Sequence, residues 1–218
     1  YASKNITFSI HVHIGLSDKD KLVSVTNTLR RWISPLLALS TNSPFFEGQN
    51  TGMLSSRTFQ FGLFPRTEIP SFLNSYKDYE EIINKYIETK TISKPRQIWW
   101  KIRPHYDYNT IEFRVCDVQR SLQNTEMIIS LVQALVRSIV INNDYNHDYC
   151  YEYLTDGLWK ASSKNMSCKI IDPLDSKLLT MEDMIGRMIA YSKNSLDYFG
   201  NSHVINTVQN IIKNGTEA

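Results

Sequence analysis

Two histidines, two residues apart, lie in the most regular pattern of the chain. In residues 7–15 apolar side chains alternate with polar ones, and His11 and His13 both fall on the polar side. Because successive side chains of a strand point to opposite faces, the alternation predicts a strand whose apolar side, Phe8 included, packs inward. The two imidazoles then share the other face about 7 Å apart, an arrangement that suits a divalent metal ion or polyphosphate oxygens.

A second stretch has the same alternation. In residues 111–117, Glu112 and Arg114 lie on the side opposite the apolar residues. Glu112 offers an oxygen ligand for Mg²⁺, and Arg114 offers a fork of donors for phosphate. Cys116 falls on the same side of the predicted strand as Arg114. A side chain so small and apolar is more often buried than placed in a site. Placed side by side, the two strands would form a polar floor of two histidines, a glutamate and an arginine; a solvated, charged exterior is the alternative.

This set of groups favours phosphoryl transfer. Metal ions clamp a polyphosphate, and cations neutralise the charge that develops on the transferred group. The sequence has no glycine-rich phosphate loop, so a nucleotide would have to be held by the polar floor itself. One alternative stays open here, a metal-dependent hydrolase that uses His11, His13 and Glu112.

Composition narrows the class of protein. The 218 residues carry a formal net charge of +2, which is too near neutral to indicate a nucleic-acid partner. The most apolar run, residues 127–141, contains Gln133 and Arg137 and is shorter than a membrane span. We therefore expect a buried helix there and no membrane partner. Three widely spaced cysteines fit neither a disulfide scaffold nor a zinc ribbon, and they indicate reduced thiols in the cytoplasm.

Periodicity and capping signals predict the elements that position these groups. Ser17 is expected to cap the first helix, and Pro35 to kink it or end its regular part. Residues 42–52 are expected to form a long loop, and residues 99–105 to pair with 111–117 as a hairpin. Helices are predicted at residues 18–36, 76–88, 125–141, 149–163, 181–196 and 202–213. This order of elements predicts an α+β fold with an antiparallel sheet.

Five segments resemble a known family. They read HVHIG at 11–15, LLALSTNSPF at 36–45, GQNTG with SR at 48–57, WWKIRPH at 99–105 and IEFRVCD at 111–117. They are similar to the segments HVHVG, LLALSANSPF, GRDTGYASYR, WWDIRPH and VEVRVCDVQ of the bacterial carboxylate-amine ligases of the type 2 glutamate–cysteine ligase group. Two departures stand out: Lys101 replaces an aspartate, and Gln49 replaces an arginine.

The resemblance implies a glutamine-synthetase-like fold, in which helices pack on one face of a curved antiparallel sheet and the active site lies on the other. It implies that residues 1–218 are a single partial catalytic domain, truncated at both ends, from the C-terminal portion of that domain. The family's GVEEE strand of metal carboxylates is not in this sequence, and only the start of its GTGADRQ segment matches, at residues 214–218. The chain alone is therefore expected to be inactive.

The implied activity is ATP-dependent amide formation in glutathione biosynthesis. ATP would phosphorylate the γ-carboxylate of glutamate or another carboxylate, and cysteine or another amine would attack the acyl phosphate. Mg²⁺ or Mn²⁺ is the implied metal, and a homodimer is an expected assembly. A homologue that binds a small molecule without catalysis is the further alternative.

The same resemblance implies roles for individual side chains. His11 and Glu112 would be metal or phosphate ligands, and His11 and His13 would line the ATP site. Arg114 would face the transferred phosphoryl group. Two further arginines are candidates for holding a substrate carboxylate or phosphate, Arg57 and Arg103.

Overall fold

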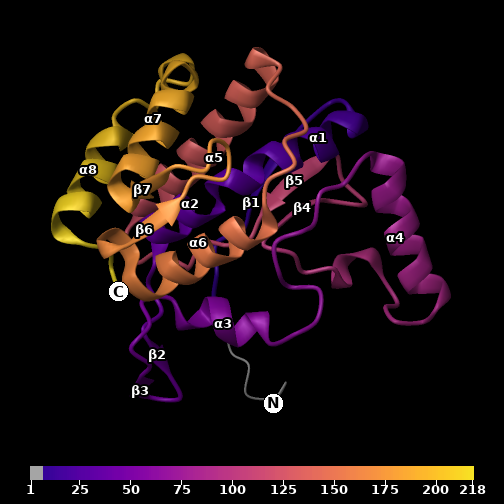
Figure 1. Ribbon diagram of the computed structural model, residues 1–218, viewed down its shortest axis with the longest axis horizontal. Coiled ribbons are helices and arrows are strands. Elements are labelled where there is room, and N and C mark those ends of the chain that lie inside the picture. Colours follow the sequence, from indigo (N-terminus) through magenta and orange to yellow (C-terminus); the bar gives the residue numbers. More distant parts are fainter. Residues whose placement is uncertain (1–6) are drawn as a thin grey trace.

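The computed structural model describes residues 7–218 (Figure 1). Tyr1, where the predicted domain begins, lies outside the described residues. The predicted α+β class with antiparallel strands is confirmed. The helices are α1 (Lys19–Leu29), α2 (Ile33–Ser40), α3 (Ser56–Gly62), α4 (Tyr76–Glu88), α5 (Leu122–Asn142), α6 (Tyr151–Lys164), α7 (Met181–Tyr198) and α8 (Val204–Asn214). The strands are β1 (Val12–Gly15), β2 (Phe45–Phe46), β3 (Gln49–Asn50), β4 (Ile102–Pro104), β5 (Thr110–Phe113), β6 (Lys169–Ile171) and β7 (Leu178–Thr180).

The sheet that carries the two alternating stretches has the strand order β1-β5-β4, and both pairs are antiparallel. The predicted pairing of the two stretches and the predicted hairpin are therefore confirmed. The register sets His13 opposite Glu112, and Glu112 opposite Arg103. The neighbouring row points to the other face and is buried: Val12, Phe113 and Ile102. Side-chain parity thus separates a polar row from an apolar row across three strands.

The start of the first alternating stretch differs from its prediction. The strand β1 begins only at Val12, and Phe8 is 69% exposed. Its predicted inward packing is wrong, because β5 ends at Phe113 and only an isolated bridge between Ser9 and Asp117 continues the pairing. Beyond that point the alternation has no layer beneath it to bury the phenyl ring.

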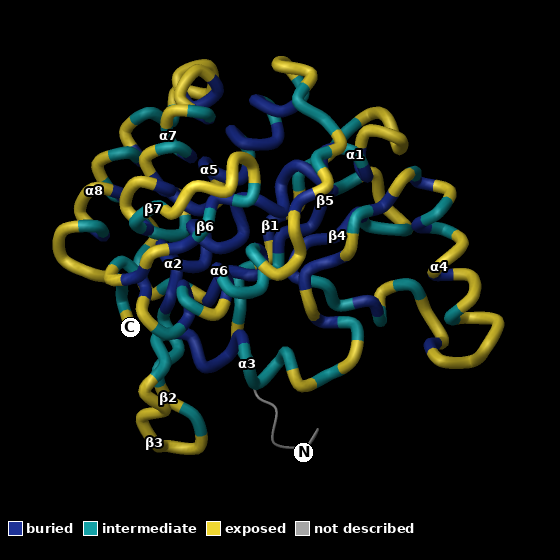
Figure 2. The backbone as a smooth tube through the Cα atoms, viewed as in Figure 1, coloured by how far each residue is buried: buried dark blue, intermediate teal, exposed yellow. Residues whose placement is uncertain are grey.

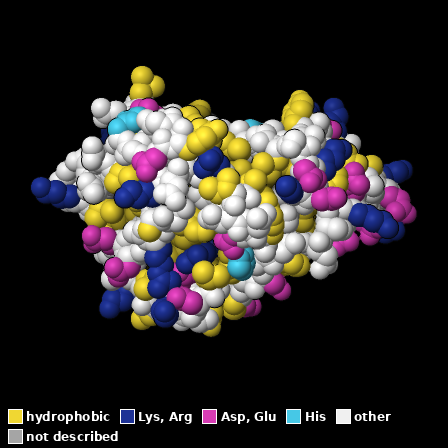
Figure 3. Space-filling view, turned by 90° about the horizontal axis from the view of Figure 1, so that it is seen from above, with side chains coloured by type: hydrophobic (Ala, Val, Ile, Leu, Met, Phe, Trp, Pro, Cys, Tyr) yellow, Lys and Arg dark blue, Asp and Glu magenta, His cyan; other side chains and the backbone are white. Residues whose placement is uncertain are grey.

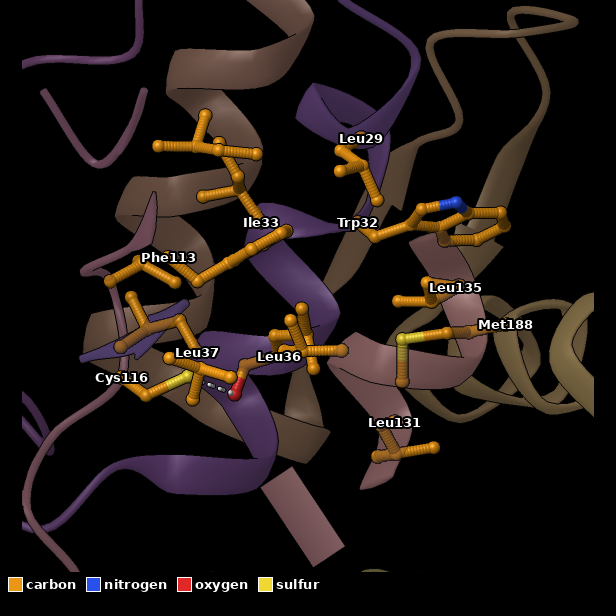
Figure 4. Close-up of a cluster of buried hydrophobic side chains, with 14 of the residues drawn as sticks. Leu29, Trp32, Ile33, Leu36, Leu37, Phe113, Cys116, Leu131, Leu135 and Met188 are labelled. Atoms are coloured by element: carbon orange, nitrogen blue, oxygen red, sulfur yellow. Dashed lines mark hydrogen bonds between the residues drawn. The ribbon is translucent and has the colours of Figure 1, made fainter. Parts of the chain in front are cut away.

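The core lies between the sheet and a layer of helices. Figure 4 shows α1 and α2 in the middle of this core, with α5 and α7 on one side and the end of β5 on the other. Cys116 is buried there, as predicted, and its thiol donates to the carbonyl of Leu36 at 3.9 Å. Burial raises the pKa of the Cys116 thiol to about 11. Figure 2 shows the same division, with a buried centre and an exposed β2–β3 hairpin.

The first helical region is interrupted, as Pro35 predicts. The α-helix α1 ends at Leu29, a 3₁₀ segment follows (η2, Arg30–Trp32), and α2 resumes at Ile33. Pro35 has no N–H to donate to the carbonyl four residues earlier, and its ring crowds that carbonyl. The predicted cap was wrong by one residue: Asp18 caps α1, and its carboxylate accepts from the amide of Asp20 at 3.0 Å.

Short strands are the elements that periodicity did not predict. Residues 42–52 contain the β2–β3 hairpin, whose turn places Glu47 and Gly48 at φ values of 49° and 78°. Two consecutive positive φ values are typical of the type I′ turn that suits a tight hairpin. The β6–β7 hairpin and the short helix α3 were also missed. Strands of two or three residues are too short to show a period.

The long apolar helix α5 is a core helix. It runs for 21 residues, longer than predicted, and by length and composition alone it could cross a membrane. Ten of its residues are buried, and it contacts α7, α8, α1 and β1. Figure 3 shows basic and acidic side chains intermixed on one face of the molecule, in keeping with the small net charge.

A glycine in α6 lets two helices approach closely. A Cβ atom built on Gly157 would lie 2.8 Å from the Ser34 hydroxyl in α2, whereas one built on Gly186 in α7 meets nothing within 4 Å. We expect Gly157→Val to lower the free energy of unfolding by about 1–3 kcal/mol through overpacking. The matched Gly186→Val should change it by less than about 0.5 kcal/mol. Urea denaturation measures both, and equal effects would contradict the close approach.

Candidate functional site

Five side chains, from three strands and from the residues that directly precede β1 and follow β5, meet on the polar face of the sheet. We call His11, His13, Arg103, Glu112 and Arg114 the polar cluster. Glu112 lies at its centre and is only 2% exposed. Its Oε2 accepts from Arg103 Nε at 2.6 Å, and its Oε1 accepts from Arg114 Nη1 at 2.5 Å. The same Oε1 lies 3.2 Å from His11 Nδ1 and 3.7 Å from His13 Nε2.

The register and the chain around the hairpin position the two arginines. The position of Arg103 beside Glu112 follows from the pairing of β4 with β5. Its guanidinium also donates to the carbonyls of Arg96 and Ile98, and this segment buries it. Arg114 follows the end of β5, where its amide donates to the carbonyl of Lys101 at 2.9 Å. The Arg103 side chain is thus fixed by backbone carbonyls as well as by Glu112, whereas the Arg114 side chain is held by Glu112 and only its backbone by β4 and its neighbours.

The charges in the polar cluster do not cancel. Burial by itself would raise the pKa of Glu112, but the hydrogen bond from His11 and the charges of Arg103 and Arg114 lower that pKa well below its usual range. Glu112 is therefore ionised at any physiological pH. Two guanidinium groups against one carboxylate leave a surplus positive charge even when both histidines are neutral, and such a surplus attracts an anion.

One donor of the polar cluster has no partner. The Nε of Arg114 is buried, and the structure gives it no hydrogen bond among the described residues. The guanidinium carbon lies 6.0 Å from the centre of the Phe61 ring, so an apolar group covers one of its sides. A buried N–H without an acceptor costs roughly 1–3 kcal/mol, and an anionic oxygen would relieve that cost. Of the two orphaned buried donors in the described part of the chain, Trp32 Nε1 and Arg114 Nε, the second belongs to the polar cluster.

Two histidines beside the arginines are held neutral. Burial is the largest cause that lowers the pKa of His13 and of His105, and the charge of Arg103 lowers both further. Their rings lie 5.7 Å apart, and His13 Nδ1 lies 3.1 Å from the Thr110 hydroxyl. The sequence placed His105 near the second strand without giving it a role. The Nδ1 of His105 accepts a hydrogen bond from the amide of Asp107 at 3.3 Å. It can accept only when it carries no proton.

Arg57 lies next to the polar cluster and not in it. Its guanidinium donates to the carbonyl of Arg114 at 2.7 Å, to that of Val115 at 3.0 Å and to the carboxylate of Asp117 at 3.3 Å. Burial is the largest cause that lowers the pKa of Arg57, and the Asp117 charge opposes it. In this arrangement Arg57 ties the first turn of α3 to the end of the sheet. Its role as a substrate ligand stays a prediction.

Asp117 is a functional candidate that the sequence reasoning missed. It is 1% exposed and accepts from the Asn42 amide at 2.9 Å, the Ser43 hydroxyl at 2.7 Å and the Ser55 hydroxyl at 3.1 Å. Together with Arg57, these bonds hold residues 42–57 against the sheet. The signal was available: Asp117 falls on the apolar parity of residues 111–115, where a carboxylate must be buried and paired.

The polar cluster fits an anion better than a metal ion. Glu112 is its one carboxylate, and both carboxylate oxygens already accept from guanidinium groups. Among residues 7–218, no group of three or more His, Cys, Asp or Glu side chains is arranged to hold a metal ion. By themselves, these side chains do not form the oxygen-rich shell that Mg²⁺ takes. The ligand roles of His11 and Glu112 stay predictions.

Two cavities lie near the polar cluster, and one of them is lined by a member of it, His13. One, of about 250 Å³, is lined by residues that include Phe8, Phe45 and Arg57. The other, of about 410 Å³, is lined by residues that include His13 and Phe199. The first cavity reaches the polar cluster only through Arg57, whose guanidinium donates to the carbonyl of Arg114.

The fold and the polar cluster define an α+β domain with a cationic cluster on one face of its sheet. The whole chain, residues 1–218, matches the model of glutamate-cysteine ligase family 2, and the chain belongs to that family. A relative from Herpetosiphon aurantiacus named "Putative glutamate--cysteine ligase 2" is 32% identical over 220 residues. Relatives of the same name from Sorangium cellulosum and Solibacter usitatus are 30% and 32% identical. Each match covers 100% of this chain but only 57–59% of the relative.

The lowered pKa values of His13 and His105 predict a loss of stability in acid. An unfolded histidine titrates near pH 6.5, whereas the folded pKa values of His13 and His105 lie lower. Their contribution to stability is therefore present above about pH 6.5 and is lost as the pH falls through the folded pKa values. His105→Asn keeps an acceptor for the Asp107 amide but cannot titrate, so it should reduce the drop in Tm between pH 7.5 and 5.5.

The matched control is His203→Gln, which removes a histidine that is 55% exposed and paired with Glu126 at 2.9 Å. It should retain the pH dependence of the unchanged protein. Thermal unfolding at the two pH values measures all three proteins. An identical Tm drop in His105→Asn and in the unchanged protein would refute the assignment.

Proposed function

We propose that this chain is part of an ATP-dependent carboxylate-amine ligase of the glutamate–cysteine ligase type, with a glutamine-synthetase-like fold. Membership of glutamate-cysteine ligase family 2 supports the proposal, as does the name of its relatives. The chain spans 57% of the length of the relative from Herpetosiphon aurantiacus, so the activity is proposed for the intact protein.

The proposed reaction has two steps. The γ-carboxylate of glutamate takes the terminal phosphoryl group of ATP, which gives an acyl phosphate and ADP. The nitrogen of an amine then attacks the acyl carbon, the C–O bond to phosphate breaks, and the amide and inorganic phosphate are released. Both steps place negative charge on phosphoryl oxygens, and fixed donors that meet this charge are the main source of catalysis in such reactions.

The unpaired Nε–H of Arg114 carries the proposal. This N–H is buried, and Glu112 balances the charge of its guanidinium only in part. Arg114 also belongs to the row of polar side chains for which the sequence predicted phosphoryl transfer. Glu112 fixes Arg114 through Nη1 and is itself fixed by Arg103. Arg114 is the proposed catalytic residue, and Glu112 and Arg103 orient it. The pKa of His13 is lowered in the structure, and a nearby phosphate would raise it. The histidine would then take up a proton and donate to the same anion.

Mg²⁺ or Mn²⁺ remains an expectation from the family resemblance, and its oxygen ligands would have to include carboxylates beyond Glu112. A transition-metal hydrolase built on His11, His13 and Glu112 finds no support, because guanidinium groups already occupy both oxygens of that carboxylate.

Arg114→Lys tests the proposal in the intact protein. Lysine keeps the charge but loses the planar fork that bonds Glu112 and presents a second donor at the same time. With ATP, glutamate and a panel of amines, we expect ADP release to slow by about 100- to 1,000-fold in kcat, as when one donor to a developing anion is removed. A coupled assay of ADP measures the rate.

The matched control is Arg96→Lys. The Arg96 side chain is exposed, and the residue contacts the polar cluster only through its backbone carbonyl. It should leave kcat unchanged. Equal rates for Arg114→Lys and the unchanged protein would remove Arg114 from the chemistry. ATP binding without ADP release from any amine would favour the homologue that lacks catalysis.

A further inference from the structure

The cavity at the His13 end of the polar cluster has walls from three elements. It occupies about 410 Å³ and lies between the end of β1, one face of α5 and Phe199, which follows α7. Figure 1 shows α5 and α7 side by side, and α5 also contacts β1. The volume falls within the roughly 300–1,000 Å³ typical of small-molecule sites. Because His13 lines both the cavity and the polar cluster, a single ligand can reach both.

The wall from α5 is apolar apart from Gln133 and Arg137. Gln133, Val136 and Val140 recur at intervals of three and four residues, so they share one face of the helix. Gln133 is half-buried, and the structure gives its carboxamide no hydrogen bond among the described residues. A carboxamide offers a donor and an acceptor side by side in one plane. Such a group in an apolar wall can read the edge of a flat heterocycle.

Arg137 also lines the cavity, and residues of α7 hold its side chain. Its guanidinium carbon lies 3.7 Å from the centre of the Tyr198 ring, and Nη1 donates to the Ser195 hydroxyl at 3.3 Å. The Tyr198 ring in turn meets the Phe199 ring edge-on, with centres 5.2 Å apart and an interplanar angle of 80°. The arginine therefore fixes the aromatic pair, and Phe199 is a firm wall of the cavity.

We propose that this cavity binds the purine base of the nucleotide, with its phosphates directed toward His13 and Arg114. Gln133 pairs with the hydrogen-bonding edge of the base through its carboxamide, as glutamine does with adenine elsewhere. Phe199 and the two valines cover the faces of the ring. The inference rests on the proposed function, because that function supplies the nucleotide. It adds the part of the chain that recognises the base, which lies outside the five resembling segments.

Gln133→Ala and Phe199→Ala in the intact protein test the base pocket. Calorimetry compares ATP with inorganic tripolyphosphate, which has the phosphates and no base, under the same conditions. We expect each substitution to weaken ATP binding by about tenfold, since a paired edge or a stacked base is worth roughly 1–3 kcal/mol. Tripolyphosphate should bind each variant as it binds the unchanged protein. Val140→Trp, which fills the cavity from a half-buried position, should likewise weaken ATP alone.

The matched control is Gln123→Ala, because Gln123 is exposed on the first turn of the same helix and lies outside the cavity. It should bind both ligands normally. If all variants bind ATP as tightly as the unchanged protein, the base does not enter this cavity, and the proposed ligase function is unaffected. If the unchanged protein binds neither ATP nor tripolyphosphate, the proposed function fails and the inference fails with it. Equal weakening of both ligands would indicate damage to the phosphate end and would also overturn the inference.

Discussion

The site depends on one buried carboxylate. Removing an ion from water costs several kcal/mol even after the protein relaxes, so Glu112 must be paired on both oxygens to remain charged in the sheet. Arg103 and Arg114 supply that pairing, and Arg103 is anchored in turn to the carbonyls of Arg96 and Ile98. These bonds join β5 to β4 and to the segment before it. The donors are therefore in place before any anion arrives, which is the condition for strong electrostatic stabilisation.

The arginines around the sheet are unequally paired with carboxylates. Arg57 has Asp117 to itself, whereas Arg103 and Arg114 share Glu112. Lys101 stands where the family segment has aspartate, and it is also buried, with its Nζ donating to the carbonyl of Thr58. Burial lowers the pKa of Lys101 to about 8, so this lysine can lose its charge readily. The uncompensated charge and the free N–H thus coincide at Arg114.

The sequence predicts the features of the site that depend on local structure, and it does not predict those that depend on tertiary packing. Side-chain parity is a local property of a strand, so it predicted the row of His13 and Glu112 before any packing was known. Burial of a side chain depends on which distant segment packs over it. No pattern in residues 95–98 indicated that this segment would cover Arg103. The exposure of Phe8 was missed for the same reason. The family resemblance supplied Arg57, but its bonds to two backbone carbonyls and Asp117 needed coordinates.

The core helix α5 connects the two ends of the site. At its first turn, the carboxylate of Glu217 accepts from the amide of Ser121 and from the side chain of Asn42, next to Asp117. Twelve residues further along, Gln133 faces the cavity at the His13 end. At 1.5 Å per residue this separation is about 18 Å, and a helix packed into the core cannot stretch or shorten. A reaction that joins two substrates through one phosphoryl group needs two pockets at a fixed spacing. The same apolar helix that stabilises the fold therefore fixes the spacing between the cavity at His13 and the residues around Asp117.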